Sequence, residues 1–285
     1  MSNDNPSGYG LSADKKSQSI EPPPIHYLPR PPQDLSLPIA LIGAGGISEY
    51  HLQAYQQCGL NVVALCDRNL DSATCRRDQF FPDAAVYSDY HELFDRHDIK
   101  VADITTHPDA RLKIIESALT RGIHVLSQKP FVTDLSDGER LVQLAAENNV
   151  LLAVNQNGRW APHFSYMRNA IASGLIGDVV SVDFSLQWDQ TWIAGIPAFE
   201  SMQHMVLFDF AIHWFDILGS LMQGAPPTSV YAVARGFPGQ TYQPPALASV
   251  TIAYPGALAS MSLNAHTRLG EEDVTTVVGT KGTLR

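Results

Sequence analysis

The sequence is poor in cysteine, and its cysteines form neither a metal-binding nor a disulfide pattern. The 285 residues include three, Cys58, Cys66 and Cys75, which lie in one stretch without CxxC spacing. An odd number of clustered cysteines is typical of free thiols in a reducing compartment rather than of a disulfide framework. We therefore expect neither disulfide bonds nor a metal held by cysteines.

The chain also has too few basic residues for a surface that binds nucleic acid. It carries 19 Lys and Arg against 29 Asp and Glu, which gives a formal net charge of -10. Such a balance disfavours contact with nucleic acid and with anionic membranes. Small molecules are the expected partners.

The sequence shows neither a secretory signal nor a convincing membrane span. The N-terminus, MSNDNPSGYG, lacks a basic start followed by an apolar core. The longest apolar run, residues 205–222, contains Asp209, His213 and Asp216 at helical spacing, which predicts a buried helix with one polar stripe. A cytoplasmic protein is expected.

Proline content and hydrophobic pattern divide the chain into three parts. Eight of the 19 prolines lie in the first 38 residues, so residues 1–36 are expected to form a disordered, Pro-rich tail. Residues 37–158 alternate short apolar runs with amphipathic stretches, which predicts a Rossmann domain with a doubly wound parallel sheet. Residues 159–285 begin with a helix and continue as long strand-like runs joined by YPGA and GTKG turns, which predicts an α/β domain with an open, mainly antiparallel sheet. The last turn should open into another strand, so this second domain is expected to be incomplete at its C-terminus.

A glycine-rich turn follows the first predicted strand. The segment GAGGIS, residues 43–48, meets the GxGxxG pattern at Gly43 and Gly45 but has Ser48 in place of the third glycine. Gly43 permits a tight turn, and Gly45 lets the backbone approach a pyrophosphate at the N-terminus of a helix that starts at Gly46. The same glycines are also compatible with a plain strand-to-helix turn.

An acidic residue at the end of the second predicted strand supports the dinucleotide interpretation. Asp67 comes 24 residues after Gly43, near the place where a carboxylate bonds both ribose hydroxyls of the dinucleotide. A carboxylate repels the 2'-phosphate of NADP, so Asp67 favours NAD. Arg68 beside it can offset this repulsion, and NADP therefore stays open.

A lysine follows the fifth predicted strand. In IHVLSQKP, residues 123–130, the strand stops at Lys129, and Pro130 fixes the turn, with a cis bond as one means. A strand end can carry an ordinary surface lysine, but ligands of an open parallel sheet bind outside the carboxyl ends of its strands. Lys129 is therefore expected to face the crevice near Thr106. The candidate cofactor-binding residues are Gly43, Gly45, Gly46, Ile47, Asp67, Arg68, Thr106 and Gln128.

A polar stripe in DFAIHWFD forms the second candidate site. Asp209, His213 and Asp216 lie at i, i+4 and i+7, on one face of a helix. A histidine on so apolar a helix is often a satisfied core residue, whereas a buried carboxylate needs a partner or a role. Asp and His together can orient and deprotonate a substrate hydroxyl. No metal is expected, because no further ligand pattern accompanies the pair.

The segment NQNGRW, residues 155–160, ends the sixth predicted strand at the domain junction. Its candidate substrate residues are Asn157 and Arg159. Two interpretations of Arg159 remain open, namely contact with a substrate oxygen and a clamp between the domains.

These segments, in this order, resemble the glucose-fructose oxidoreductase and inositol dehydrogenase family (Gfo/Idh/MocA) over about residues 38–284. They are ALIGAGGISEYHLQAY, ALCDRN, GIHVLSQKPF, NQNGRWAP, DFAIHWFD and VVGTKGTL. The resemblance implies a Rossmann domain that binds NAD or NADP, and a second domain that shapes the substrate site and usually the oligomer interface. Lys129 matches the lysine of the family's Glu-Lys-Pro motif, which bonds the reacting oxygen. Asp209 and His213 match its Asp-x-x-x-His pair, with His213 as the proton-transfer group.

Three positions depart from the family pattern. Gln128 replaces the Glu of the motif and removes a charge near Lys129. Ser48 replaces the third glycine, which we expect to loosen the packing of the helix. The segment MVLFD, residues 205–209, replaces a small, Gly-rich approach to Asp209, which predicts a narrower or more apolar pocket.

The resemblance implies an NAD(P)-dependent oxidoreductase that transfers a hydride between a nicotinamide cofactor and a CH-OH group of a sugar, inositol or other polyol. Lys129, Asp209 and His213 are its expected catalytic residues, and a homo-oligomer, dimer or tetramer, is expected. The alternative is a dinucleotide-binding sensor or regulatory protein of the same fold without catalysis. Retention of all three catalytic candidates argues against this alternative, while Gln128 keeps it open.

Overall fold

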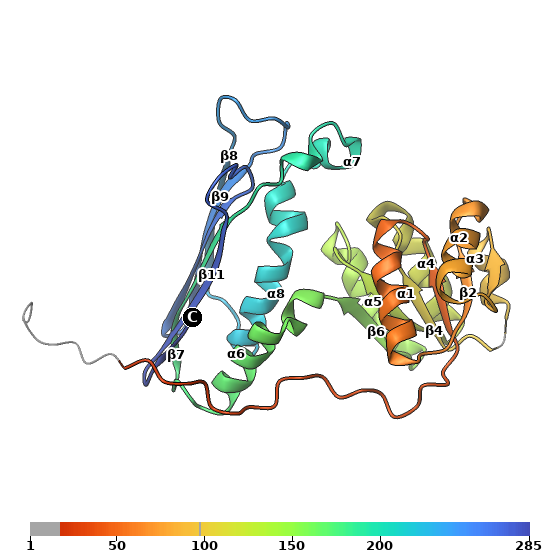
Figure 1. The fold of residues 1–285 in the computed structure, drawn as a ribbon, viewed down its shortest axis with the longest axis horizontal. Helices are drawn as coiled ribbons and strands as arrows, with labels where there is room; N and C mark the ends of the chain where they lie inside the picture. The colour runs from red at the N-terminus through yellow and green to blue at the C-terminus, as the bar shows by residue number, and fades with distance from the viewer. Residues whose placement is uncertain (1–17, 97) are drawn as a thin grey trace, which may run out of the picture.

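The computed structural model describes residues 18–96 and 98–285. The expected tail, residues 1–36, therefore lies in part outside the described residues. Its described part, residues 18–36, contains no helix and no strand. The chain then forms two sheets, each with its own hydrophobic core, which stand side by side in Figure 1.

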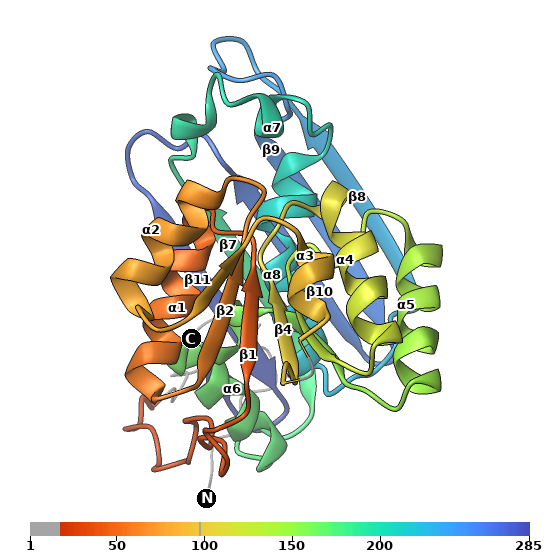
Figure 2. The same ribbon diagram turned by 90° about the vertical axis from the view of Figure 1, so that its right-hand side faces the viewer.

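The first sheet contains six parallel strands in the order β3-β2-β1-β4-β5-β6, as the alternating pattern predicted. Helices cover both of its faces (Figure 2). The strands are β1 (Ile39–Ile42), β2 (Val62–Cys66), β3 (Ala85–Tyr87), β4 (Val101–Ile104), β5 (His124–Gln128) and β6 (Leu152–Asn155). The helices are α1 (Gly46–Cys58), α2 (Leu70–Phe80), α3 (Tyr90–Phe94), α4 (Pro108–Thr120) and α5 (Leu135–Glu147).

Strand β1 shows why this segment is apolar throughout. Ile39 and Leu41 belong to the core on the α1 and α2 side, whereas Ala40 and Ile42 belong to the core on the α4 and α5 side. Successive side chains of a strand point to opposite faces, so a strand covered on both faces needs apolar residues at every position. The strand order reverses between β1 and β4, and in open parallel sheets ligands bind at the carboxyl ends of the strands at such a reversal.

The second sheet is mixed and mainly antiparallel, with the order β12-β11-β7-β10-β9-β8. Strands β7 and β10 pair in parallel, and the other neighbours are antiparallel. The predicted hairpin turns join β9 to β10 and β11 to β12. The strands are β7 (Val179–Gln187), β8 (Ser229–Arg235), β9 (Leu247–Tyr254), β10 (Ala257–Asn264), β11 (Glu272–Gly279) and β12 (Thr283–Leu284).

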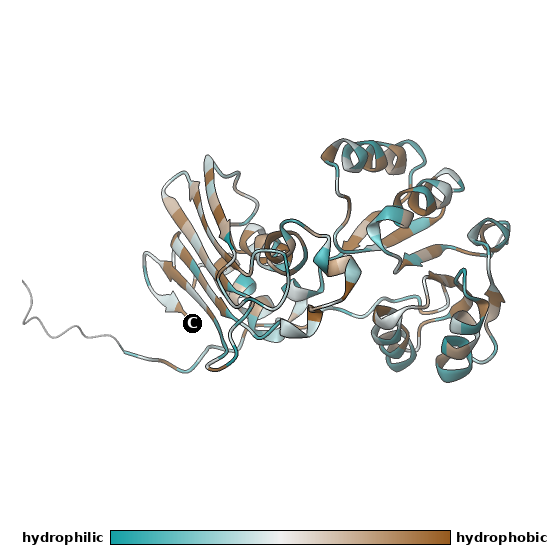
Figure 3. Ribbon diagram, turned by 90° about the horizontal axis from the view of Figure 1, so that it is seen from above, coloured by the Kyte–Doolittle hydropathy of each residue, from teal (hydrophilic) through white to brown (hydrophobic). Residues whose placement is uncertain are grey.

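Helices α6 (Pro162–Ala172) and α8 (Ile212–Leu221) pack on one face of the second sheet, on the side toward the first domain (Figure 1). Val182, Phe184 and Leu186 of β7 join Ile217 and Leu221 of α8 in this core. Because only one face is covered in the described chain, apolar and polar residues alternate along the strands, seen as bands in Figure 3. The remaining short elements are η1 (Asn157–Trp160), η2 (Thr191–Ile193), α7 (Pro197–Glu200) and the π-helical turn η3 (Val206–Phe210).

The apolar run at residues 205–222 is divided between η3 and α8 rather than forming one long helix. Across residues 18–96 and 98–285, no helix combines the length and the apolar character that crossing a membrane requires.

The described part of the N-terminal segment runs along α6, a contact that the sequence did not predict. The Tyr166 hydroxyl donates to the main-chain oxygen of Pro23 over 2.9 Å, and the Asn169 side chain donates to that of His26 over 2.9 Å. Figure 1 shows this red segment passing from α6 to the start of β1.

Candidate functional site

The glycine-rich turn joins β1 to α1 and leaves open space at the start of the helix. Gly43 has φ = 105°, and a Cβ there would lie 2.9 Å from the main-chain nitrogen of Thr106, so both conformation and contact demand glycine. A Cβ on Gly45 or Gly46 would meet nothing within 4 Å. Gly45 caps α1 without a side-chain hydrogen bond, so N–H groups of its first turn remain available to an anion.

Ser48, which replaces the third glycine, is fully buried in α1. Its hydroxyl donates to the main-chain oxygen of Gly45. A buried hydroxyl with a partner costs little, so this substitution is accommodated within the turn itself. Ile47 beside it is 38% exposed at the start of the helix.

Asp67 follows β2 and is fixed against the glycine-rich turn. One carboxylate oxygen accepts from the Ala44 N–H over 2.7 Å, and the other accepts from the Asn69 N–H over 2.8 Å. Arg68 is exposed and has no ion-pair partner among the described residues. The carboxylate thus lies beside the glycine-rich turn.

Lys129 follows β5, and its peptide bond to Pro130 is cis. Its Nζ donates to the main-chain oxygen and to Oδ1 of Asp209, both over 3.0 Å, and both side chains are less than one-fifth exposed. The Lys129 N–H donates to the side-chain oxygen of Gln128 over 3.0 Å, and Gln128 is 8% exposed. Gln128 therefore supports the lysine backbone with a neutral side chain rather than contacting its ammonium group.

The polar stripe lies on a helix that is not uniformly α-helical. Asp209 belongs to η3, where the Ala211 N–H bonds the main-chain oxygen of Val206, five residues earlier, over 2.8 Å. His213 and Asp216 follow in α8. The helix is therefore π-helical at Asp209 and α-helical at His213 and Asp216, and the π turn changes the angular spacing between Asp209 and the later two residues.

Arg159 forms a two-pronged ion pair with Asp216. Its Nε donates to Oδ2 over 2.6 Å, and one of its terminal nitrogens donates to Oδ1. This hydrogen bond raises the pKa of Arg159. The guanidinium is thus joined to α8, while Asn157 in the same η1 turn is exposed.

His213 lies between Asp209 and Asp216 along the chain. Asp209 pairs with Lys129, and Asp216 pairs with Arg159. The Nδ1 of His213 is buried and has no hydrogen-bond partner among the described residues. Burial, and next the positive charge of Lys129, lower the pKa of His213 to about 4, although Asp209 and Asp216 oppose the shift. The imidazole is therefore neutral at neutral pH and free to accept a proton.

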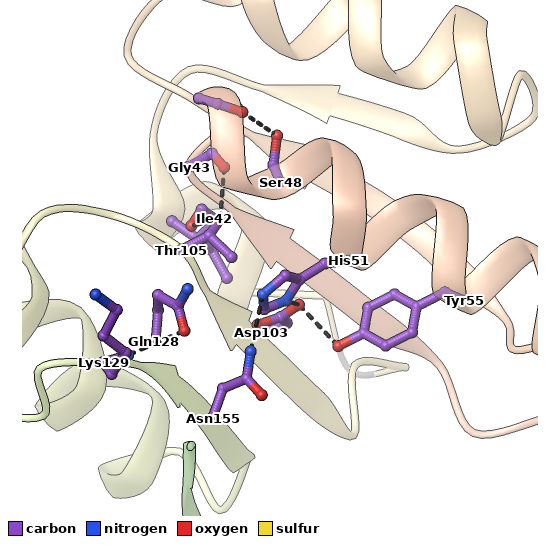
Figure 4. A network of polar contacts seen from close by, with 11 residues as sticks. Ile42, Gly43, Ser48, His51, Tyr55, Asp103, Thr105, Gln128, Lys129 and Asn155 are labelled. Carbon is purple, nitrogen blue, oxygen red and sulfur yellow. Dashed lines mark hydrogen bonds and ion pairs between the residues drawn. The ribbon is translucent and has the colours of Figure 1, made fainter. Parts of the chain in front are cut away.

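A buried polar network beside this site was missed by sequence reasoning. Asp103 of β4 accepts from the Tyr55 hydroxyl over 2.7 Å and contacts His51 Nδ1 at 2.7 Å, and Asn155 of β6 contacts His51 Nε2 at 3.0 Å. Figure 4 shows these side chains gathered between α1 and the ends of β4 and β6. Burial and the Asp103 carboxylate raise the pKa of Tyr55. The aspartate within an otherwise apolar strand, VADI, was the available signal.

Arg111 was also missed. It lies in the first turn of α4, is 2% exposed, and donates to main-chain oxygens of the turns after β4 and β5. The signal was its register, because Arg111 precedes the buried Ile114 and Ile115 by three and four residues and so shares their face.

Among the described residues, no group of three or more His, Cys, Asp or Glu side chains is arranged to hold a metal ion.

Two family models match this chain. The model described as "Oxidoreductase family, NAD-binding Rossmann fold" matches residues 37–156, and the model described as "GFO/IDH/MocA C-terminal domain" matches residues 164–285.

Curated relatives of this chain include dehydrogenases of D-apiose and of inositol. A D-apiose dehydrogenase of Paraburkholderia graminis is 31% identical over 182 residues, which are 62% of this chain and 48% of that protein. An inositol 2-dehydrogenase of Salmonella typhimurium is 26% identical over 191 residues, which are 66% of this chain and 55% of that protein. The matched regions thus span about half the length of these two relatives.

Solved structures share the whole architecture. An oxidoreductase from Agrobacterium radiobacter in complex with NAD+, L-tartaric acid and magnesium has a TM-score of 0.80 at 26% identity, over 88% of this chain and 74% of that one. A scyllo-inositol dehydrogenase from Lactobacillus casei with bound NAD(H) and scyllo-inositol has a TM-score of 0.77 at 20% identity, over 87% of this chain and 75% of that one. The second comparison concerns the fold alone.

Proposed function

Because this chain belongs to the Gfo/Idh/MocA oxidoreductase family, with its NAD-binding Rossmann fold, we propose that it is an NAD(P)-dependent dehydrogenase or reductase of polyols. It transfers a hydride between the cofactor and a CH-OH group of a sugar, inositol or related compound. One observation carries the proposal: Lys129 is hydrogen-bonded to Asp209 across the two domains. Asp209 precedes His213 by four residues, and the buried Nδ1 of His213 has no hydrogen-bond partner within residues 18–96 and 98–285.

The residues of the glycine-rich turn fit the cofactor. Gly45 and Gly46 leave open space at the N-terminus of α1, and Asp67 lies beside the turn to take the ribose hydroxyls. Asp67 favours NAD over NADP. Once bound, the nicotinamide supplies the hydride acceptor or donor, and the protein positions the reacting carbon.

Lys129 and His213 have different roles at the substrate hydroxyl: Lys129 bonds its oxygen, and His213 accepts its proton. The Lys129 ammonium has three N–H donors, of which Asp209 accepts two through its main-chain and side-chain oxygens, leaving the third for the substrate oxygen. A positive charge at that oxygen favours loss of its proton. His213 accepts the proton at Nε2, since Nδ1 is buried near Gly158.

The charges of the site favour a neutral substrate. The positive charges of Lys129 and Arg159 each have a carboxylate partner, and His213 is neutral. A substrate with a carboxylate would find no unpaired cation among these three side chains to neutralise its charge. Hydroxyl groups can form hydrogen bonds with the charged pairs without adding net charge. The names of the curated relatives, D-apiose and inositol dehydrogenases, agree with this class.

The proposal is tested with purified protein, NAD+ or NADP+, and a panel of aldoses, cyclitols and their carboxylated analogues, with absorbance of the reduced nicotinamide as the readout. We expect turnover with at least one neutral polyol, and a fall of about 100-fold or more in kcat for His213→Gln, a size typical of lost general acid-base catalysis. Tight binding of NADH without turnover on any member would instead identify a dinucleotide sensor.

A further inference from the structure

Arg111 is the most deeply buried cation of the described chain, with 2% of its surface exposed. Its Nε donates to the main-chain oxygen of Thr106 over 3.1 Å, and a terminal nitrogen donates to the same oxygen. The other terminal nitrogen donates to the main-chain oxygens of Gln128 and Pro130. One guanidinium therefore joins the turn after β4 to the turn after β5.

This position is costly for a cation. Among the described residues no carboxylate lies within ion-pair distance of Arg111, so three main-chain oxygens are its compensation. Arg111 also lies in the first turn of α4, where the helix dipole disfavours positive charge. Burial lowers the pKa of Arg111 to about 10, so the charge persists at neutral pH. An apolar side chain would fill the space at lower cost but would leave the three oxygens unbonded.

The three acceptors belong to residues next to Lys129 and next to the glycine-rich turn. Gln128 and Pro130 flank Lys129, so the backbone of the lysine is held on both sides. Thr106 lies against the glycine-rich turn, because a Cβ on Gly43 would meet its nitrogen at 2.9 Å. Arg111 thus connects Thr106, which lies against the glycine-rich turn, to the two residues that flank Lys129.

We propose that Arg111 is a positioning residue that fixes the turns after β4 and β5 relative to each other and so sets the place of Lys129. It acts through main-chain contacts and touches neither substrate nor cofactor in this role. The expected effect on catalysis rests on the proposed function. The rigidity of the two turns can be measured without any turnover.

The test compares Arg111→Met and Arg111→Lys with Arg121→Met. Arg121 caps the same helix at its other end, and its side chain is 36% exposed, so it controls for loss of an arginine from α4. Hydrogen exchange by mass spectrometry follows residues 105–108 and 128–132, with β10 as the internal reference. Steady-state kinetics and NADH fluorescence follow kcat, KM and dinucleotide affinity.

In Arg111→Met we expect amide hydrogen exchange in both turns to accelerate by about tenfold or more. Exchange in β10 should stay unchanged, because the opening is local rather than global. The kcat should fall by about 100-fold with the KM for the polyol within about threefold, because misplacement of a catalytic group by about 1 Å costs that much. Arg111→Lys keeps the charge but has a single nitrogen to bond the oxygens of both turns. We therefore expect its exchange rates and its kcat to lie between those of the wild type and those of Arg111→Met. If Arg111→Met does not fold, Arg111→Lys carries the comparison. Arg121→Met should match the wild type.

The inference is overturned if a folded Arg111 variant keeps wild-type exchange in both turns, or if both variants keep kcat within about twofold, well below the usual effect of misplaced groups. A wild-type protein that turns over no polyol would defeat the proposed function. The exchange comparison would then decide the positioning role by itself.

Discussion

Gly158 of η1 lies directly against His213 of α8. A Cβ on Gly158 would lie 3.3 Å from the Cβ of His213 and 3.5 Å from its Nδ1. The first of these distances is tighter than most Cβ contacts and the second is an ordinary van der Waals contact, so the lack of a side chain at Gly158 helps to determine where His213 lies. The domain junction and the proposed proton acceptor are therefore coupled through packing.

Gly158→Val should displace His213 and lower kcat by about 10- to 100-fold, because a catalytic group must be placed to within about 1 Å. Gly158→Ala should have a smaller effect, since its Cβ requires a shift of a few tenths of an ångström. Gly219→Ala is the matched control, because a Cβ there meets nothing within 4 Å in α8. Equal kcat values for Gly158→Val and Gly219→Ala would show that the contact has no catalytic consequence.

Lys129→Met should abolish most turnover while leaving NADH affinity within about tenfold, because the lysine stabilises charge on the substrate oxygen rather than holding the dinucleotide. Asp209 also loses its ion-pair partner, so the free energy of unfolding, measured with urea, should fall by about 1 to 3 kcal/mol. Lys113→Met, at an exposed position in α4, is the control for both measurements. Normal turnover by Lys129→Met would refute the assignment.

His213 should give the protein a specific dependence of stability on pH. Its folded pKa of about 4 lies below its unfolded value of 6.5, so the unfolded state binds more protons between these values. Stability from this group is complete above pH 6.5 and is lost as the pH falls toward 4. The total is about 3 kcal/mol.

The measurement is urea unfolding of wild type and His213→Gln at a series of pH values. Their difference in unfolding free energy should change across pH 4 to 6.5 and stay constant from pH 7 to 8. A titration of the His213 ring by NMR with a midpoint near 6.5 would contradict the burial argument.

Asp67→Asn should shift cofactor preference toward NADP. The substitution removes the charge that repels a 2'-phosphate but keeps an oxygen that can accept from the Ala44 N–H. The ratio of NADPH to NADH affinity should rise by about tenfold or more, as expected when a like charge is removed from a phosphate site. Fluorescence titration measures both affinities. Tighter binding of NADPH than of NADH by the wild type would refute the role of Asp67.

Asp103→Asn should destabilise the first domain, because the buried carboxylate accepts from Tyr55 and pairs with His51. We expect a loss of about 3 to 5 kcal/mol in the free energy of unfolding, the range for removing one partner of a buried ion pair. The exposed Asp83→Asn should change it by less than about 0.5 kcal/mol. A double-mutant cycle with Tyr55→Phe would show whether the two side chains act together. Additive effects would argue against a coupled network.

Sequence reasoning located most candidate residues because their positions follow from local rules. Strands alternating with helices imply a parallel sheet, whose carboxyl ends collect Gly43, Asp67, Thr106 and Lys129 at one edge. The abrupt end of the strand left a cis bond before Pro130 as one means of fixing the turn, and the structure has this bond. Arg111 escaped notice because an arginine in an amphipathic helix is usually exposed, and three main-chain acceptors are invisible in a sequence pattern.

The sequence by itself determined the order of elements, the glycine-rich turn and the identity of the polar residues, since these depend on backbone preferences and on hydrophobic period over short stretches. The tertiary structure decided their partners. Lys129 is separated from Asp209 by 80 residues and Arg159 from Asp216 by 57, so packing between distant elements selects each pair. The π turn at Asp209 is likewise a product of packing, because no local propensity specifies an extra residue in a helix. The tertiary fold therefore settled which charges pair, and it buried His213 so that the pKa of its imidazole is lowered.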